Sequence, residues 1–416
     1  MENRFYLGID LDDENAVVSY YELNMKEPET LSMVAGSEVF QIPVLLTKKK
    51  GIGQWFIGEE AKRLAMQQGQ DGADRLLSRA IRHETIFVEQ EKYPADELLA
   101  LYIKKLLLLS GSLGKRGIPD KLVICLEKLS REVTELLSQI ALKQGLSEEQ
   151  LVLVDRKECF YYFVCHQNRD IHQHDVCLFD YRGEDILCCR LYKNARTTPQ
   201  LITLTEEIRR MDANRKDEAF LKVLEDAFRG HVVSASYLIG DGFSGDWMKQ
   251  SVSFLCKGRR AFVGKNLYSK GACYAAAVLE GRHEWQYVYL GDNEMKMNLC
   301  LKVRNRGVAE FLTLVSAGDN WYETRGECDV ILDGSAEIDF WLQAPSSKEA
   351  KVEKLTLADL PERPNKTSRL HIEAKPLSDH EVQIHIKDLG FGELFRGSDK
   401  VWEYVMSLEE ESIWEN

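Results

Sequence analysis

The stretch YLGIDLDDENAVVSYYELN, Tyr6 to Asn24, predicts a β-hairpin near the start of the chain. An apolar run leads to Asp10, a short polar turn follows, and Ala16-Val17-Val18 starts a second apolar run. Hairpins of this kind in phosphate-binding domains carry small residues at the tip, because backbone N–H groups must reach the anion. Here the tip carries the acids Asp12-Asp13-Glu14. The stretch therefore predicts the hairpin and raises the question of what its acids do.

The composition is that of a globular protein with two or three domains. The chain has 416 residues, of which 44% are hydrophobic and 29% charged. Its net charge of −13 argues against unaided binding to nucleic acid or to an anionic membrane, because both need a basic surface. The basic segments 48–50 and 257–260 are short, and we expect solvated turns there.

Cysteine usage and hydropathy predict a cytoplasmic protein without membrane insertion. No signal peptide is apparent in the first residues, and the most apolar helix candidate, 98–109, is interrupted by Lys104-Lys105. The ten cysteines form no CxxC pair and are scattered through apolar runs, as expected of small core residues in a reducing compartment.

The first two-thirds of the chain alternates strand and helix patterns. We predict helices at 94–109, from a cap at Ser130 to Gly145, and at about 199–229. The predicted strands cover residues 5–9, 16–21, 122–126, 151–154, 176–180 and 186–192.

From about Trp285 short alternating segments and turn signals predict a β-sandwich. Its expected strands are 285–290, 297–303, 310–315, 328–332, 338–342, 352–357, 370–374 and 382–386. The residues from 397 to 416 are expected to form an acidic helix or tail.

Seven segments, in order along the chain, resemble motifs of the actin-like ATPase superfamily, and within it DnaK-type chaperones. The first hairpin stands where that family has its first phosphate hairpin, and VCLFDYRGEDILCCRLY stands at the second. SYLIGDGFSGDWM resembles the adenosine loop. The others are FIGEEAKRLA, residues 121–146, LVDRKECFYYF and YSKGACYAA, the last two resembling the interlobe helices.

The resemblance implies an α/β two-lobed actin-like ATPase fold with a reduced second lobe, followed by a mostly β C-terminal sandwich. The nucleotide-binding-type domain would cover 1–283, with lobe I at about 1–178, lobe II at about 179–260 and a return helix at about 268–283. The substrate-binding-like sandwich would cover 284–396. The interval between Asp180 and Gly240 is expected to hold one charged helix in place of a further subdomain.

The resemblance also implies roles for individual residues. Asp10 and Asp180 would hold a metal ion through water, Asp155 would stand near the catalytic glutamate, and Arg79, with Arg82 or Arg182 as alternatives, would replace the missing catalytic lysine. The implied nucleotide-binding positions are Gly8, Asp10, Gly183, Gly240, Asp241 and Gly242.

The phosphate-binding positions depart from the family. Gly-Thr-Thr of the first loop becomes Asp12-Asp13-Glu14, and Gly-Gly-Gly-Thr of the second becomes Arg182-Gly183-Glu184-Asp185. Like charges about 6 Å apart repel by roughly 3 kcal/mol at an effective dielectric near 20. We therefore expect a pseudo-ATPase that uses no cofactor. Its expected partner is another protein or a peptide.

Two other functions remain open from the sequence: an active ATPase that uses ATP and Mg²⁺ in an unusual site, and an actin-like filament subunit. For each residue, a structural role is also possible. Strand-end aspartates cap helices or turns, and Gly240, Gly242 and Gly245 permit a tight turn. The histidines of 165–175 are expected in a polar loop. Trp321, Tyr322 and Trp341 fit a core, whereas the tail aromatics Trp402, Tyr404 and Trp414 fit a partner-binding helix.

Overall fold

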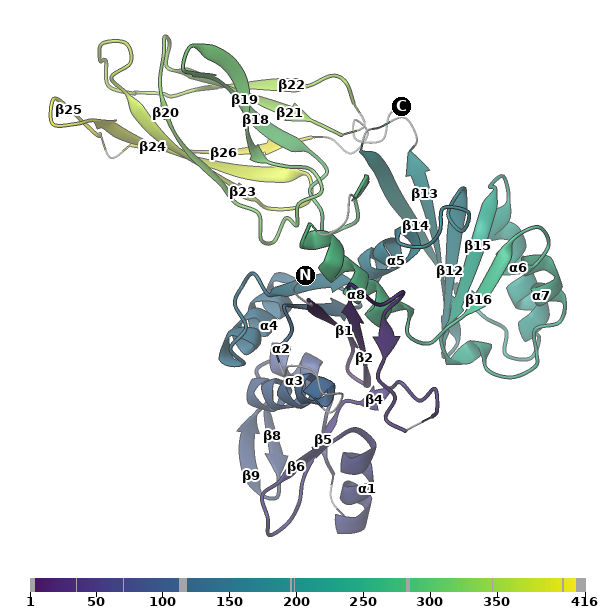
Figure 1. The fold of residues 1–416 in the computed structure, drawn as a ribbon. Helices are drawn as coiled ribbons and strands as arrows, with labels where there is room; N and C mark the ends of the chain where they lie inside the picture. Colours follow the sequence, from purple (N-terminus) through teal and green to yellow (C-terminus); the bar gives the residue numbers. More distant parts are fainter. Residues whose placement is uncertain are drawn as a thin grey trace. The chain divides into compact units, whose positions relative to one another are not determined.

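A computed structural model describes residues 4–34, 36–69, 71–111, 118–194, 197, 199–281, 285–345, 347–398 and 400–408 (Figure 1). The chain divides into two compact units, Met1–Tyr192 with Leu204–Trp285, and Lys193–Thr203 with Gln286–Asn416. The first unit mixes helices and sheets, and the second is rich in strands. The predicted mixed α/β architecture with a β-rich C-terminal region is confirmed.

The first sheet of unit 1 is built around the opening hairpin. Strands β1 (Phe5–Leu11) and β2 (Asn15–Glu22) pair antiparallel from Phe5↔Glu22 to Leu11↔Ala16, which confirms the predicted hairpin. Their apolar residues are almost entirely buried, because both faces of β1 are covered. The sheet order is β11 (Leu151–Asp155), β10 (Lys121–Leu126), β1, β2 and β3 (Glu29–Thr30), with β4 (Ile42–Pro43) also paired to β2.

A second sheet, most of whose strands belong to unit 1, contains the second predicted hairpin. Its order is β16 (Arg260–Val263), β15 (Val233–Ile239), β12 (Asp175–Arg182), β13 (Asp185–Asn194) and β14 (Gln200–Arg210). The first residues of β14 pair with β17 (Tyr287–Tyr289). Helices α6 (Lys216–Phe228) and α7 (Gln250–Leu255) contribute Phe220, Leu224 and Leu255 to one core cluster with Phe179 of β12. This cluster fixes β12 and its turn.

Helices α5 (Arg156–Cys165) and α8 (Leu267–Leu279) pack against each other with their backbones in close contact. A Cβ built on Gly271 of α8 would lie 2.1 Å from the carbonyl oxygen of Cys159. A Cβ on Gly8 of β1 would lie 2.3 Å from the carbonyl oxygen of Ser269. Only glycine allows these approaches, which place the first turn of α5 beside the end of β1.

The other elements of unit 1 complete the layers around the first sheet. Ser130 caps α4 by accepting a hydrogen bond from the Val133 amide, as predicted. The elements are α1 (Gly58–Gln68), α2 (Leu76–Ile81), α3 (Ala95–Gly111), α4 (Arg131–Lys143), η1 (Asp241–Phe243), the sheet of β6 (Trp55–Ile57), β5 (Leu45–Lys48) and β7 (Ala73–Asp74), and the hairpin of β8 (Thr85–Val88) and β9 (Glu91–Pro94).

Unit 2 consists mainly of two antiparallel sheets that share one hydrophobic core. The first has the order β19 (Val308–Val315), β18 (Asn298–Asn305), β21 (Glu337–Gln343) and β22 (Lys351–Thr356). The second has the order β20 (Gly326–Ile331), β23 (Arg369–Pro376), β24 (Glu381–Phe391) and β25 (Phe395–Arg396), with β26 (Val401–Ser407) paired to β24. Leu301 and Phe340 of the first sheet lie in the same core cluster as Ile372 and Ile384 of the second.

A buried ion pair joins the loop before β23 to β24. Both nitrogens of the Arg363 fork donate to the Asp388 carboxylate at 2.8 Å, and the backbone amides of Gly390 and Ser398 donate to the same carboxylate at 2.9 Å. The side chains are 6% and 0% exposed. Burial alone would raise the pKa of Asp388. The hydrogen bonds outweigh burial, so the net shift of this pKa is downward.

Three secondary-structure predictions are wrong. The predicted helix 199–229 is strand β14 followed by α6, since Leu201 and Ile202 are buried against neighbouring strands. Between Asp180 and Gly240 the chain therefore forms β13, β14, α6 and β15, far more than one helix. Residues 401–407 form β26, and the predicted tail aromatic Trp402 is 9% exposed in the core. Trp414 lies outside the described residues.

Candidate functional site: an aspartate–arginine cluster between the two hairpins

The acids at the tip of the first hairpin have separate structural partners. Asp12 Oδ1 accepts hydrogen bonds from the backbone amides of Glu14 at 2.9 Å and Asn15 at 2.8 Å, which closes the turn. Asp13 Oδ1 accepts from the Ser78 amide at 2.9 Å, in the first turn of α2. Glu14 is exposed. Two of the three acids are therefore hydrogen-bonded to backbone amides.

Arg156, the first residue of α5, binds two aspartates of the first hairpin. Its Nε lies 3.0 Å from Asp10 Oδ1 and its Nη2 lies 2.8 Å from Asp12 Oδ2. The Arg156 and Asp10 side chains are only 10% and 12% exposed. The guanidinium also lies 5.3 Å from the centre of the Tyr268 ring. A buried guanidinium therefore neutralises the carboxylates at the end of β1.

Arg182 links the second hairpin to the first. Its Nε lies 2.9 Å from Asp180 Oδ1, and its Nη1 lies 3.5 Å from Asp12 Oδ2. The Tyr268 hydroxyl donates to Asp180 Oδ2 at 3.2 Å. Three aspartates and two arginines thus form one connected ion-pair network, which we name the aspartate–arginine cluster (Asp10, Asp12, Arg156, Asp180, Arg182).

The electrostatics of the cluster favour ionised arginine. Burial raises the pKa of Asp10, although the Arg156 charge opposes it. Burial also raises the pKa of Asp12, but hydrogen bonds from the Asn15 amide and from Arg156 outweigh it, so this pKa is lowered. Burial lowers the pKa of Arg156, but the charge of the Asp10 carboxylate and other neighbours raises it by more. The net shift of the Arg156 pKa is therefore upward. The guanidinium stays charged and holds Asp12 ionised.

The other two residues with implied catalytic roles are engaged elsewhere. Asp155 is buried and accepts a hydrogen bond from the Glu158 amide at 2.7 Å, which makes it the N-cap of α5. Arg79 on α2 forms ion pairs with Glu84 at 3.0 Å and Asp74 at 3.5 Å. Asp10 and Asp180 are joined through Arg156, Asp12 and Arg182. Asp155 instead caps α5, and Arg79 pairs with two acids near α2.

The glycines of the two hairpins have different reasons to be glycine. Gly8 lets α8 approach β1. Gly183 has φ = 61° at the turn between β12 and β13, and a Cβ there would meet open space. Gly183 is therefore required by the turn conformation.

The adenosine-like loop packs against an aromatic side chain of the second hairpin. Gly240 has φ = 96°, and a Cβ built on it would lie 2.3 Å from the Tyr181 carbonyl oxygen. A Cβ on Gly242 would lie 2.3 Å from the Tyr181 ring, and Asp241 between them is exposed. Tyr181 is buried among the rings of Phe243 and Trp247. Close packing explains both glycines.

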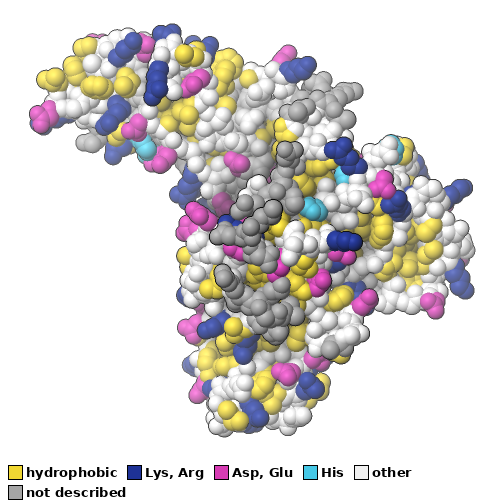
Figure 2. Space-filling view, viewed as in Figure 1, with side chains coloured by type: hydrophobic (Ala, Val, Ile, Leu, Met, Phe, Trp, Pro, Cys, Tyr) yellow, Lys and Arg dark blue, Asp and Glu magenta, His cyan; other side chains and the backbone are white. Residues whose placement is uncertain are grey.

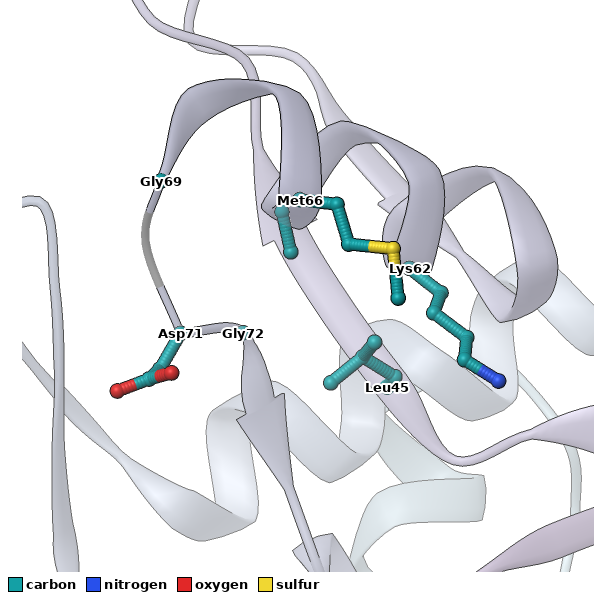
Figure 3. Close-up of a pocket in the computed structure, with 7 residues that line it drawn as sticks. Leu45, Lys62, Met66, Gly69, Asp71 and Gly72 are labelled. Atoms are coloured by element: carbon teal, nitrogen blue, oxygen red, sulfur yellow. The ribbon is translucent and has the colours of Figure 1, made fainter.

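One surface hollow lies apart from the cluster. The hollow lies between α1 and the segment that leads into β7 and has a volume of about 410 Å³. Figure 3 shows residues that line it. Its lining combines the apolar side chains of Leu45 and Met66 with Lys62 and Asp71. None of its lining residues belongs to the aspartate–arginine cluster.

The histidine-rich loop, possible metal sites and possible membrane helices are the remaining candidate features. His172 is buried, and its Nε2 lies 3.0 Å from the Gln167 carbonyl oxygen. In the described part of the chain, no group of three or more His, Cys, Asp or Glu side chains is placed to hold a metal ion. The helices among the described residues include none long and apolar enough to cross a membrane. On the face shown in Figure 2, basic and acidic side chains are interspersed.

The sequence analysis missed Arg156 and Tyr268 as members of the cluster. Arg156 follows Asp155 directly, so its position at the start of the predicted interlobe helix was the available signal. Its partner Asp10 is 146 residues away. Tyr268 opens the segment that resembles the second interlobe helix.

Two family matches together cover most of the chain. Residues 27–292 match the C-terminal region of a family of unknown function (DUF5716), and residues 294–408 match a domain of unknown function (DUF8552). The first match spans more than half of the chain, so this protein belongs to the DUF5716 family. No curated protein matches it. Neither family description states an activity.

Proposed function

We propose that this protein has a DnaK-like, actin-like two-lobed fold and has lost the ability to hydrolyse ATP. We further propose that it acts as a protein-binding scaffold or regulatory module. The observation that carries the proposal is the Arg156 guanidinium, which lies 3.0 Å from Asp10 and 2.8 Å from Asp12. In the resemblance, Asp10 would hold the hydrated metal of a nucleotide. Here Asp10 has a fixed cation from the chain itself.

The donor groups between the hairpins do not suit the phosphates of ATP. A phosphate cradle uses backbone N–H groups, hydroxyls and a free cation. Here the Asp12 carboxylate accepts hydrogen bonds from two backbone amides of its turn. Both arginines of the cluster form ion pairs with aspartates. The adenosine-like loop packs closely against Tyr181. We therefore infer that this protein does not use ATP or Mg²⁺ and that it binds another protein in the cytoplasm, with the absence of a CxxC pair from its sequence as support.

Calorimetric titration of the full chain with ATP and Mg²⁺, combined with a thermal-shift measurement, tests the loss of nucleotide binding. We expect neither heat nor a thermal shift at millimolar nucleotide. Binding tighter than about 100 μM, or about 5.5 kcal/mol, would contradict the proposal and favour the active ATPase. Turnover lost in Asp10→Ala would then establish that alternative.

A peptide-binding measurement tests the second half of the proposal. The full chain is screened against an array of unfolded-protein peptides with and without ATP. Peptide binding that is unchanged by ATP and is retained in Asp10→Ala supports a protein-binding module. Concentration-dependent sedimentation into polymers, with no peptide bound, would instead indicate a filament subunit.

A further inference from the structure

The four-stranded sheet of unit 2 has an exposed outer face with an aromatic centre. Along β18 and β21, Leu301 and Phe340 point into the core, so their neighbours Cys300 and Trp341 point outward and are paired in register. Phe311 of β19 packs edge-on against Trp341, with ring centres 5.2 Å apart. We call Cys300, Phe311, Trp341 and Val352 the aromatic face.

Two of the four residues of the aromatic face are exposed, whereas Cys300 and Trp341 are half-buried. Phe311 is 55% exposed and Val352 is 43% exposed. Its strand β19 is an edge strand whose first six residues are all exposed, and it pairs only with β18 within its sheet. Apolar surface of this kind on an edge strand favours an interaction partner.

Three basic and two acidic side chains lie on the same outer side of the sheet as the aromatic face. The Lys302 Nζ lies 6.0 Å from the centre of the Trp341 ring, and Lys354 neighbours Val352 along β22. Arg304 follows Lys302 on the same face of β18. Lys354 is shared with Glu337 and Asp339 at 3.7 and 4.0 Å, whereas Lys302 and Arg304 have no ion pair among the described residues. The face therefore suits an acidic segment with apolar side chains.

We propose that the occupant is the segment 409–416 of this same chain. Its sequence, EEESIWEN, combines four glutamates with an isoleucine and a tryptophan. It follows β26, whose last residue, Ser407, accepts a hydrogen bond from Lys351 Nζ of β22 at 3.2 Å. The described chain therefore passes β22, the edge strand of the sheet that carries the aromatic face, just before residue 409.

The length of the segment is sufficient. Three strand spacings of about 4.8 Å, roughly 14 Å in all, separate β22 from β19. Eight extended residues reach about 26 Å. Eight residues are therefore long enough to cross the aromatic face from β22 to β19.

Hydrogen exchange of the full chain and of a chain ending at Leu408 tests this proposal. We expect several-fold faster exchange in Val308–Val315 and Glu337–Gln343 of the shortened chain, and recovery when a peptide of sequence EEESIWEN is added. Trp414→Ala in the full chain should act like the truncation. Protection should also weaken at 1 M salt, where the screening length is about 3 Å.

A matched pair of surface variants separates docking from general destabilisation. Phe311→Ser should abolish the difference between full and shortened chains, whereas Phe391→Ser, at a 44% exposed phenylalanine on the other sheet, should preserve it. Equal exchange in full and shortened chains would overturn the proposal. Protection that grows with protein concentration would assign the face to a second copy and likewise overturn it. The test uses no nucleotide, so its result is independent of the proposed function.

Discussion

Arg156 Nε lies 3.0 Å from Asp10 Oδ1, and this contact connects the first turn of α5 to the end of β1. The two residues are 146 positions apart in the sequence. The same guanidinium reaches Asp12, which is also 3.5 Å from Arg182. One side chain therefore ties the first hairpin to α5 and, through Asp12, to the second hairpin.

Replacing Arg156 with Met should lower the free energy of unfolding by about 3–5 kcal/mol, because Asp10 would remain buried without its cation. Chemical denaturation of the full chain measures this loss. The control is Arg79→Met. The side chains of its partners Asp74 and Glu84 are 55% and 38% exposed, so the expected loss is about 0–1 kcal/mol. Equal losses for the two variants would contradict a central role for Arg156.

Asp13→Ala should remove a hydrogen bond at the first turn of α2 and cost about 1 kcal/mol of stability. Thermal unfolding and hydrogen exchange of Leu76–Ile81 report the change. Glu14→Ala, at the exposed neighbouring position, is the matched control and should change little. If both variants behave alike, the Asp13 carboxylate does not stabilise the first turn of α2.

Gly8→Ala should destabilise unit 1 by more than about 1–3 kcal/mol, because the added Cβ would meet the Ser269 carbonyl oxygen at 2.3 Å. Denaturant unfolding provides the measurement. Gly264→Ala is the control, since a Cβ there meets open space. A Gly8→Ala protein as stable as the Gly264→Ala protein would show that α8 can move away from β1 at little cost.

Acid should destabilise unit 2 through Asp388. Its pKa is lowered in the folded chain, so its contribution to stability is present above the unfolded pKa of about 3.9 and is lost as the pH falls towards the folded pKa. Asp388→Asn should remove this pH dependence and cost about 3–5 kcal/mol at neutral pH, because Arg363 remains buried.

Hydrogen exchange of β23 and β24 between about pH 5 and pH 2 follows the loss, after correction for intrinsic exchange rates. Asp339→Asn, at an exposed carboxylate on the other sheet, should leave the profile unchanged. A wild-type profile that matches that of Asp388→Asn would exclude Asp388 as its source.

The local sequence pattern predicted many helices and strands, because the residues that favour each of them lie close together in the sequence. Alternation of apolar residues identified the hairpins and most strands of unit 2, and Ser130 identified the start of α4. The same reasoning failed at β14, where LITLTEEIRR carries a mixed pattern and pairing with other strands decides the structure. It also failed at Trp402, which is buried by strands far away in sequence.

The sequence by itself determined the two hairpins, the placement of Asp10 and Asp180 at strand ends, and the acidity of the first turn. The tertiary structure decided what these acids bind. Asp12 and Asp10 meet Arg156 only because Gly8 and Gly271 allow β1, α8 and α5 to pack closely. Side chains more than a hundred residues apart become partners through that packing, and no local pattern encodes which charge lies opposite which.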